Sequence, residues 1–358
     1  MKKSLLALAV LGAFAGAASA QSSVTLFGVL DVSAANIDNK PASGASTTTQ
    51  QLRTDGLNTS RLGFRGVEDL GGGLKAGFWL EAGVNADTGT TNSKFFNRRS
   101  TVSLLGGFGE VRLGRDYTPT FWNLTVFDPF GTAGVGNIGN VLQYPATTDT
   151  PLGSGATTLT RADNTIAYFL PSGIGGLYGQ AQVAAGETPA GGPANKYAGG
   201  RLGYAAGPVD IAVAYGQTGT TNKYKLFDVG GAFSFGPAKL TAQFIQGKYL
   251  TRKQQVWQLG TVVALGQGEL HASYTHADMK GPSVAAGGTA GYTDADDANQ
   301  IAVGYAYNLS KRTAVYGNAS RVKNKGAADF RVGNVTNAPG SAAGGTSTGV
   351  EAGIRHSF

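Results

Sequence analysis

The 358-residue chain has no cysteine, and few of its residues carry charge. The charged fraction is 14%, whereas roughly a quarter of an average soluble chain is charged. Long apolar runs are also missing after the first twenty residues. The absence of cysteine excludes a disulfide framework, so an exported chain of this size must be held together in another way.

The first twenty residues, MKKSLLALAVLGAFAGAASA, differ from the rest of the chain. They combine a basic start, an apolar stretch and the final small-residue triplet ASA, which predicts a secretory signal peptide over 1–20. The apolar stretch is too short for a retained spanning helix, which needs roughly 20 apolar residues. Residues 21–358 show no linker, composition shift or charge block, so a single domain is predicted for them.

The chain is basic, with a formal net charge of +7. Nucleic-acid-binding proteins gather such charge into a patch or along one helix face. Here the basic residues are scattered along the whole sequence. This distribution, together with the predicted export, argues against nucleic acid as a partner.

Apolar residues recur at every second position in many segments, for example over 24–32, 209–215 and 301–307. Such alternation predicts strands with one apolar face, and no stretch after the first twenty residues sustains a helical period. The sequence therefore predicts an all-β protein. We count about sixteen such segments of roughly 8–13 residues, a number and length typical of bacterial outer-membrane barrels.

Two architectures fit this pattern, a soluble two-layer sandwich and a transmembrane antiparallel β-barrel. The second strand face is rich in glycine and charge, which does not suit a soluble exterior alone. Short turns also alternate with long polar loops, as periplasmic turns alternate with external loops in membrane barrels. The barrel is therefore the favoured prediction. The interruption from 117 to about 159 holds no alternating segment and is long enough to suggest a functional loop.

The segment SRLGFRG (60–66) shows what the second face carries. Leu62 and Phe64 lie on one side of the expected strand, while Arg61 and Arg65 lie on the other. An arginine facing lipid at mid-membrane costs roughly 2–4 kcal/mol. The arginines are therefore expected to face water inside the barrel, where charges of one sign focus the field.

Several segments together resemble the Gram-negative general porins. They are SVTLFGVLD, SRLGFRGVEDLGGGLKAGFWLE, FFNRRSTVSLLGGFGEVRLGRDY, RADNTIAYFLPSGIGG, YNLSKRTAVY and the ending GIRHSF. The resemblance covers essentially all of 21–358 and is weakest in the long loops. It implies a sixteen-stranded barrel, usually a homotrimer, whose third external loop folds into the lumen. It also implies that wall arginines face acidic residues on that loop.

The wall arginines of the family match Arg61, Arg98 and Arg161. The alternation places Arg99 out of phase, so it is not expected to line the pore. The loop signature of the family is altered to FDPFG, which makes Asp128 the acidic candidate on the loop. The alternative is that Asp128 only shapes the turn before the proline that follows it.

The alternation along each strand assigns other residues to the inner or the outer face of the barrel wall. Arg65, Glu81 and Arg112 share the inward phase, and they either extend the field of the lumen or pair with neighbouring wall charges. Arg115 falls on the outward phase, which suggests burial at a subunit contact. Phe358 ends the last strand and is expected to close the barrel and to carry the assembly signal.

The acidic stretch TDADDAN (293–299) lies in a long loop. It could hold a divalent cation or bridge lipopolysaccharide, but the spacing and glycine of a calcium loop are absent. A solvated external loop is therefore favoured, and no metal site is predicted.

The sequence thus predicts a porin of the Gram-negative cell outer membrane that passes small hydrophilic solutes and ions by passive diffusion, with anion preference. The alternatives are a channel with one preferred substrate and, less favoured, a barrel adhesin or enzyme. No catalysis and no cofactor are expected. The expected partners are hydrophilic solutes, inorganic anions, a homotrimer, outer-membrane lipid with lipopolysaccharide, and the barrel assembly machinery.

Overall fold

The computed structural model describes residues 23–91, 93–142, 158–186, 196–220, 223–281, 293–333 and 340–358. The predicted signal peptide at 1–20 lies outside these ranges. Within them, no helix is both long and apolar enough to cross a bilayer.

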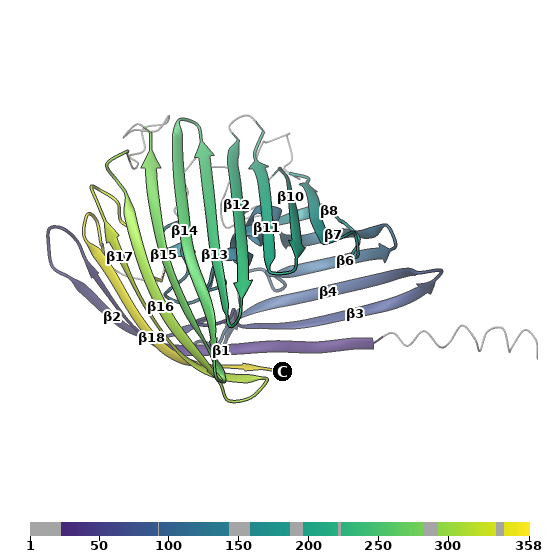
Figure 1. Ribbon diagram of the computed structural model, residues 1–358, viewed down its shortest axis with the longest axis horizontal. Coiled ribbons are helices and arrows are strands. Elements are labelled where there is room, and N and C mark those ends of the chain that lie inside the picture. Colours follow the sequence, from purple (N-terminus) through teal and green to yellow (C-terminus); the bar gives the residue numbers. More distant parts are fainter. Residues whose placement is uncertain are drawn as a thin grey trace, which may run out of the picture.

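Strands dominate the described chain (Figure 1). In chain order they are β1 (Ser23–Lys40), β2 (Thr47–Thr54), β3 (Arg61–Gly71), β4 (Leu74–Asn85), β5 (Thr90–Thr91), β6 (Arg99–Gly106), β7 (Gly109–Tyr117), β8 (Arg161–Phe169), β9 (Leu177–Ala184), β10 (Tyr197–Ala206), β11 (Val209–Thr218), β12 (Tyr224–Phe235), β13 (Ala238–Tyr249), β14 (Arg252–Leu265), β15 (Gly268–Lys280), β16 (Ala298–Asn308), β17 (Thr313–Asn324) and β18 (Thr346–Ser357). In the described part of the connection between β7 and β8 lie α2 (Pro119–Phe127) and the 3-10 helix η1 (Ile138–Asn140).

The strands form one closed antiparallel ring, because β18 returns to pair with β1. Both β2 and β3 pair with β1, β2 opposite 32–39 and β3 opposite 23–29, so together they make one interrupted barrel strand. The two-residue β5 pairs only with the end of β4. The described ring therefore has sixteen barrel strands, which confirms the predicted transmembrane-type barrel.

The two faces of the wall differ as the alternation predicts. On β1, Val24 and Leu26 point outward and are 64% and 54% exposed, whereas Asp31 and Ser33 point inward and are buried. Short turns such as 107–108 and 236–237 lie at one end of the barrel, and longer connections lie at the other. In outer-membrane barrels these are the periplasmic and external ends.

The C-terminal residue completes the closing seam between β1 and β18. The N–H of Gly28 donates to the carbonyl oxygen of Phe358, and the N–H of Phe358 donates to that of Gly28, both at 3.0 Å. A Cβ atom on residue 28 would lie 2.2 Å from the Phe358 ring, so this ring needs a glycine beneath it. Phe358 therefore takes part in barrel closure, and its role as an assembly signal stays a prediction.

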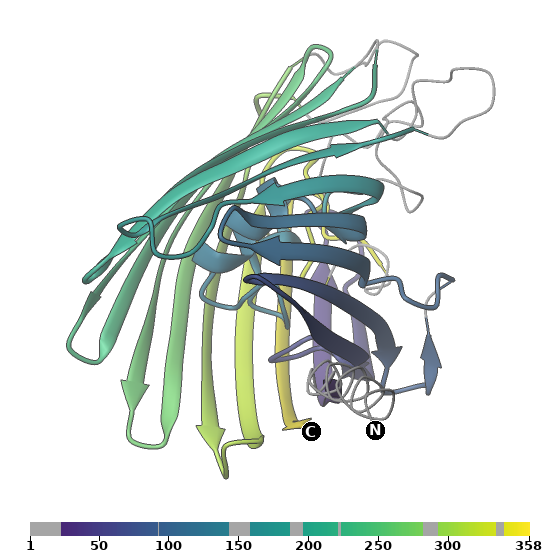
Figure 2. The same cartoon turned by 90° about the vertical axis from the view of Figure 1, so that its right-hand side faces the viewer.

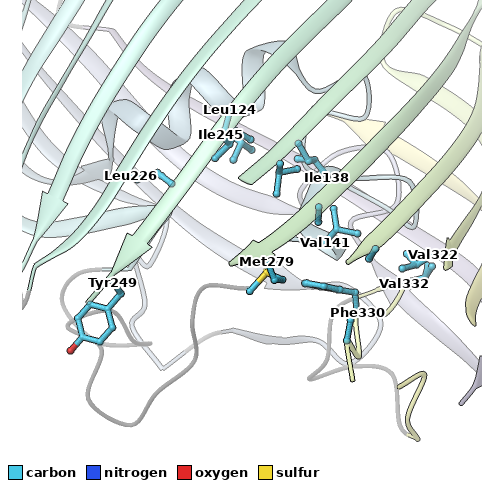
Figure 3. Close-up of a cluster of buried hydrophobic side chains, with 14 of the residues drawn as sticks. Leu124, Ile138, Val141, Leu226, Ile245, Tyr249, Met279, Val322, Phe330 and Val332 are labelled. Carbon is cyan, nitrogen blue, oxygen red and sulfur yellow. The ribbon is translucent and has the colours of Figure 1, made fainter. Parts of the chain in front are cut away.

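The long connection after β7 folds into the barrel, as predicted. Thr118 caps α2 by accepting the N–H of Phe121 at 3.3 Å. The helix packs on the inner side of β10–β13, and Figure 2 shows this blue segment between β6–β8 and the green strands behind them. Leu124 and Ile138 bury their side chains against wall residues such as Ile245 (Figure 3).

A second inward segment comes from the last external connection, after β17. Phe330 and Val332 are fully buried in the same apolar cluster as Ile138 (Figure 3). The N–H of Gly333 donates to Oδ1 of Asn140 at 2.9 Å, which joins the two loops. The sequence predicted only a polar external loop here, because its few apolar residues follow no period.

Candidate functional site

Glu81 on β4 is shared by two arginines of the inner wall. Its Oε1 atom lies 2.5 Å from Nε of Arg98 and 3.9 Å from Nε of Arg61. Its Oε2 atom accepts Nε1–H of Trp79 at 2.9 Å. One carboxylate therefore serves two guanidinium groups, and it is held in place by a neighbouring indole.

Arg161 on β8 completes the cluster without a carboxylate of its own. Its Nε–H donates to the backbone oxygen of Arg98 at 2.8 Å, and its guanidinium lies 4.3 Å from the centre of the Tyr117 ring. The hydroxyl of Tyr117 accepts Nη2–H of Arg98 at 2.9 Å. Among the described residues Arg161 forms no ion pair. The structure thus brings together Arg61, Arg98 and Arg161, as the sequence predicted.

Asp55, in the break between β2 and β3, is the second carboxylate within electrostatic reach of Arg98. It accepts the N–H of Ser60 at 2.6 Å and the hydroxyl of Thr54 at 3.0 Å. Among the described residues, the three arginines therefore outnumber the two carboxylates near them, Glu81 and Asp55, and leave a positive wall.

Arg99 also faces the lumen, and the expectation that it points away is wrong. Its guanidinium lies 4.5 Å from the centre of the Trp79 ring, and its Nε is 3.8 Å from Oδ2 of Asp116. Arg99 pairs with Glu81 in the ladder, yet the N–H of Arg98 donates to the same Glu81 at 3.2 Å. Arg98, which lies just before β6, and Arg99 therefore both contact Glu81, so the period of two residues does not hold at this point.

The position of Asp128 corrects the expectation that it opposes the wall arginines. Its carboxylate is buried at the end of α2 and accepts the N–H of Thr132 at 2.9 Å and Nε2–H of Gln258 at 3.2 Å. Burial raises the pKa of this carboxyl, while the N–H groups that bond it oppose the rise. The structure does not bring Asp128 to the arginines, because the local backbone uses it to close the turn.

Arg65 and Arg112 line a recess of the inner wall on the periplasmic side of Glu81, with a volume of ≈ 380 Å³. Arg65 stacks near Trp79, 5.1 Å from the ring centre, and is exposed. Arg112 is buried and pairs with Glu110 at 2.8 Å and with Asp116. Both therefore share the inward phase as predicted, but only Arg65 presents a guanidinium that no described carboxylate pairs.

Arg115 lies on the outward phase and is satisfied within its own chain. Its Nη1 pairs with Asp163, and its Nε–H donates to the backbone oxygen of Asn97 at 2.7 Å. Lys94 pairs with the same aspartate. These contacts hold the guanidinium of Arg115 within its own chain, although its carboxylate partner is shared with Lys94.

The wall opposite the arginines holds the inward loop by polar side chains. Gln300 on β16 is fully buried; it donates to the backbone oxygens of Gly136 at 3.0 Å and Asn137 at 3.1 Å, and it accepts from Asn140 at 3.0 Å. Asn123 on α2 donates to Asp228 and accepts Nε–H of Arg201 at 2.8 Å. These contacts set the loop position and therefore the width of the lumen.

The acidic residues at 293–297 shape turns. Asp296 accepts the N–H of Ala327 at 2.6 Å and the hydroxyl of Thr293 at 3.0 Å, while Asp297 is 3.9 Å from Lys325. In the described part of the chain no group of three histidine or acidic side chains is placed to hold a metal ion.

Sequence reasoning missed the supports of the arginine cluster. Tyr117, Trp79 and Asp116 position the guanidinium groups, but each stands in the sequence as an ordinary strand residue. Phase could have identified Trp79, which shares the inward register of Glu81. No local signal marks Tyr117, because its partners come from β8 and from the segment before β6.

Comparison with known proteins agrees with this geometry. The family model described as Gram-negative porin matches residues 7–354. Outer membrane porin protein 32 of Delftia acidovorans is 41% identical over 375 residues, covering 100% of both chains. An outer membrane porin of Bordetella pertussis is 29% identical, covering 90% of this chain and 95% of its own. The solved structure of an anion-selective porin from Comamonas acidovorans superposes with a TM-score of 0.80 at 37% identity, covering 94% of this chain and 100% of that one. The chain therefore belongs to the Gram-negative porin family and is an outer-membrane protein.

Proposed function

We propose that this porin forms a water-filled channel that lets small hydrophilic solutes and inorganic ions diffuse passively and that prefers anions. The observation that carries the proposal is the sharing of Glu81. One carboxylate serves both Arg98 and Arg61, and Arg161 has no acidic partner among the described residues. The wall therefore keeps an excess of positive charge at the level of these side chains.

The position of this charge decides its effect. Low-dielectric walls focus the field of like charges into a narrow lumen and raise the local concentration of counter-ions. The inward loop lies in the same lumen, so ions must pass close to the barrel wall. Arg61, with a side chain 24% exposed, is more open to them than Arg98, whose side chain is 8% exposed. The anion selectivity named for the Comamonas acidovorans porin supports the same reading.

A channel with one preferred substrate is the second candidate. The recess beside Arg65 and Trp79 offers a cation and an aromatic surface on the path of a solute. A preferred substrate would bind there and make its own flux saturate. The proposed general channel predicts a flux that rises linearly with solute concentration.

We also infer a homotrimer, as the resemblance to the general porins implies, and recognition of the terminal strand by the barrel assembly machinery. The aromatic Phe358 at the closing seam supports the second inference. Native mass spectrometry of the purified porin in detergent tests the first, because a monomer mass would contradict it.

The reversal potential of the reconstituted porin in a potassium chloride gradient tests the proposed function. The sign should correspond to chloride being the more permeant ion. Cation preference would contradict the arginine argument, and absence of any conductance would contradict the channel itself.

A further inference from the structure

Four lysines stand side by side on the outer surface of the barrel. The register pairs Lys225 with Lys248, Lys248 with Lys253, and Lys253 with Lys280, across β12 to β15. We call these four residues the lysine row. Each alternates with buried neighbours that pack on the inward loop, such as Leu226, so the lysines point away from the lumen.

The described carboxylates do not balance the positive charge of the lysine row. Only Lys280 has a described carboxylate partner, Asp278, at 3.0 Å, and the other three form no ion pair with any carboxylate that the structure describes. Directly opposed residues on neighbouring strands have Cβ atoms roughly 5 Å apart, and like charges in such pairs are destabilising. An arrangement of this kind is stabilised by an anion that lies over it and bonds several ammonium groups.

The surface next to the row points to a lipid rather than to a free ion. Two residues further along the strands, about 7 Å away, Gln246 and Gln255 are hydrogen-bonded at 3.0 Å. Two residues further again, Trp257 lies beside Phe244 and His276. Beyond this level the outward apolar side chains are exposed and of both kinds, such as Leu259 and, directly opposite it, Tyr274. Charged and amide levels are thus followed by mixed aromatic and aliphatic levels, as in a membrane interface.

The position of the lysine row along the barrel determines which leaflet of the membrane it contacts. The lysine row lies at the external end of the barrel, the end at which the long connection from β15 to β16 begins after Lys280. Beside it, Lys196 and Lys223 line a recess of ≈ 310 Å³ together with the polar residues Gln217 and Thr220. The lipid of the external leaflet of a Gram-negative outer membrane is a phosphorylated glycolipid, whose head group carries the anions that the row lacks.

We propose that the lysine row, with the adjacent recess, is a binding site for the phosphate groups of this glycolipid, the lipid A part of lipopolysaccharide. The phosphates lie on the lysines, and the acyl chains lie along the aromatic and aliphatic levels below. The inference rests on the outer-membrane location of the chain and is independent of the selectivity of the pore.

The test is the affinity of purified porin in detergent for diphosphorylated lipid A, measured by native mass spectrometry. The triple variant Lys225→Gln, Lys248→Gln, Lys253→Gln should bind lipid A on the order of tenfold more weakly or worse, because each lysine near an anionic lipid surface contributes separately. The matched control removes the same charge at the periplasmic end by Lys75→Gln, Lys239→Gln and Lys311→Gln, and it should bind as the unchanged porin does.

Three outcomes would overturn the proposal. Equal binding of dephosphorylated lipid A would assign recognition to the acyl chains. Equal weakening in the control variant would reduce the effect to overall charge. Full competition by millimolar inorganic phosphate would make the row a site for free anions. The triple variant should keep the reversal potential of the unchanged porin, which shows that it is folded and separates this test from that of the pore.

Discussion

Nε of Arg98 and Oε1 of Glu81 lie 2.5 Å apart, and the same oxygen is 3.9 Å from Nε of Arg61. This shared carboxylate partly offsets the positive wall, so it limits the anion preference that the arginines create. Glu81 is therefore the side chain through which selectivity can be raised without adding a charge.

Glu81→Gln should increase the anion preference. The amide keeps an acceptor for Arg98 but removes a negative charge, which at about 4 Å is worth roughly 1 kcal/mol for an ion in water. The change favours anions and disfavours cations by the same amount, about 2 kcal/mol in total, so the anion-to-cation permeability ratio should rise by up to roughly thirtyfold, measured as a reversal potential in a salt gradient. Glu68→Gln, at an exposed position near the β3–β4 turn, is the control and should change little. A shift toward cations would refute the role of Glu81.

Asp128→Asn should leave ion selectivity almost unchanged and disturb the inward loop instead. The carboxylate bonds backbone N–H groups of its own turn and Gln258, and an amide cannot accept from all of them. Single-channel recordings should show a noisier open current at an unaltered reversal potential. A change in reversal potential as large as that of Glu81→Gln would show that the charge of Asp128 acts on the permeating ions.

Gln300→Ala should loosen the inward loop. The substitution removes three hydrogen bonds and leaves the backbone oxygens of Gly136 and Asn137 without this donor. Each buried group left unpaired costs roughly 1–3 kcal/mol. Single-channel conductance should increase, because the loop no longer holds its position in the lumen. Asn308→Ala, at the exposed end of the same strand, should keep the original conductance; a change of equal size there would argue against the loop as its cause.

Phe358→Ala should lower the yield of folded barrel. The alanine keeps the backbone pairing with Gly28 but loses the ring that covers it. The folded fraction can be measured as the fast-migrating band of unheated samples on a denaturing gel. Phe358→Tyr keeps the ring and should assemble normally. Equal folded fractions for the alanine and tyrosine variants would show that assembly does not depend on the aromatic ring.

The barrel could be predicted from sequence because each wall residue obeys a local rule. Alternation assigned Val24 and Leu26 to the outside of the barrel and Glu81 to the inside. Arg61 was assigned to the inside because an arginine that faces lipid costs free energy. These rules depend only on a period of two residues. They fail where the period breaks, as at Arg98 and Arg99, which both turn inward at a local irregularity.

Contacts between residues that lie far apart in the chain could not be predicted from the sequence. Asp128 looked like a pore residue because a family pattern placed acids in that loop, but its environment is set by Gln258, which is 130 residues away. No pattern in the sequence predicts that Phe330 is buried, because its burial depends on where Ile138 lies. The lysine row likewise becomes visible only when the register aligns four strands.

The most direct test of the arginine wall is the reversal potential of the triple variant Arg61→Gln, Arg98→Gln, Arg161→Gln in a potassium chloride gradient across a zwitterionic planar bilayer. Anion preference should disappear or reverse, while the lysine-row variant, which loses the same charge outside the lumen, should match the unchanged porin. An unchanged potential in the arginine variant would contradict the account.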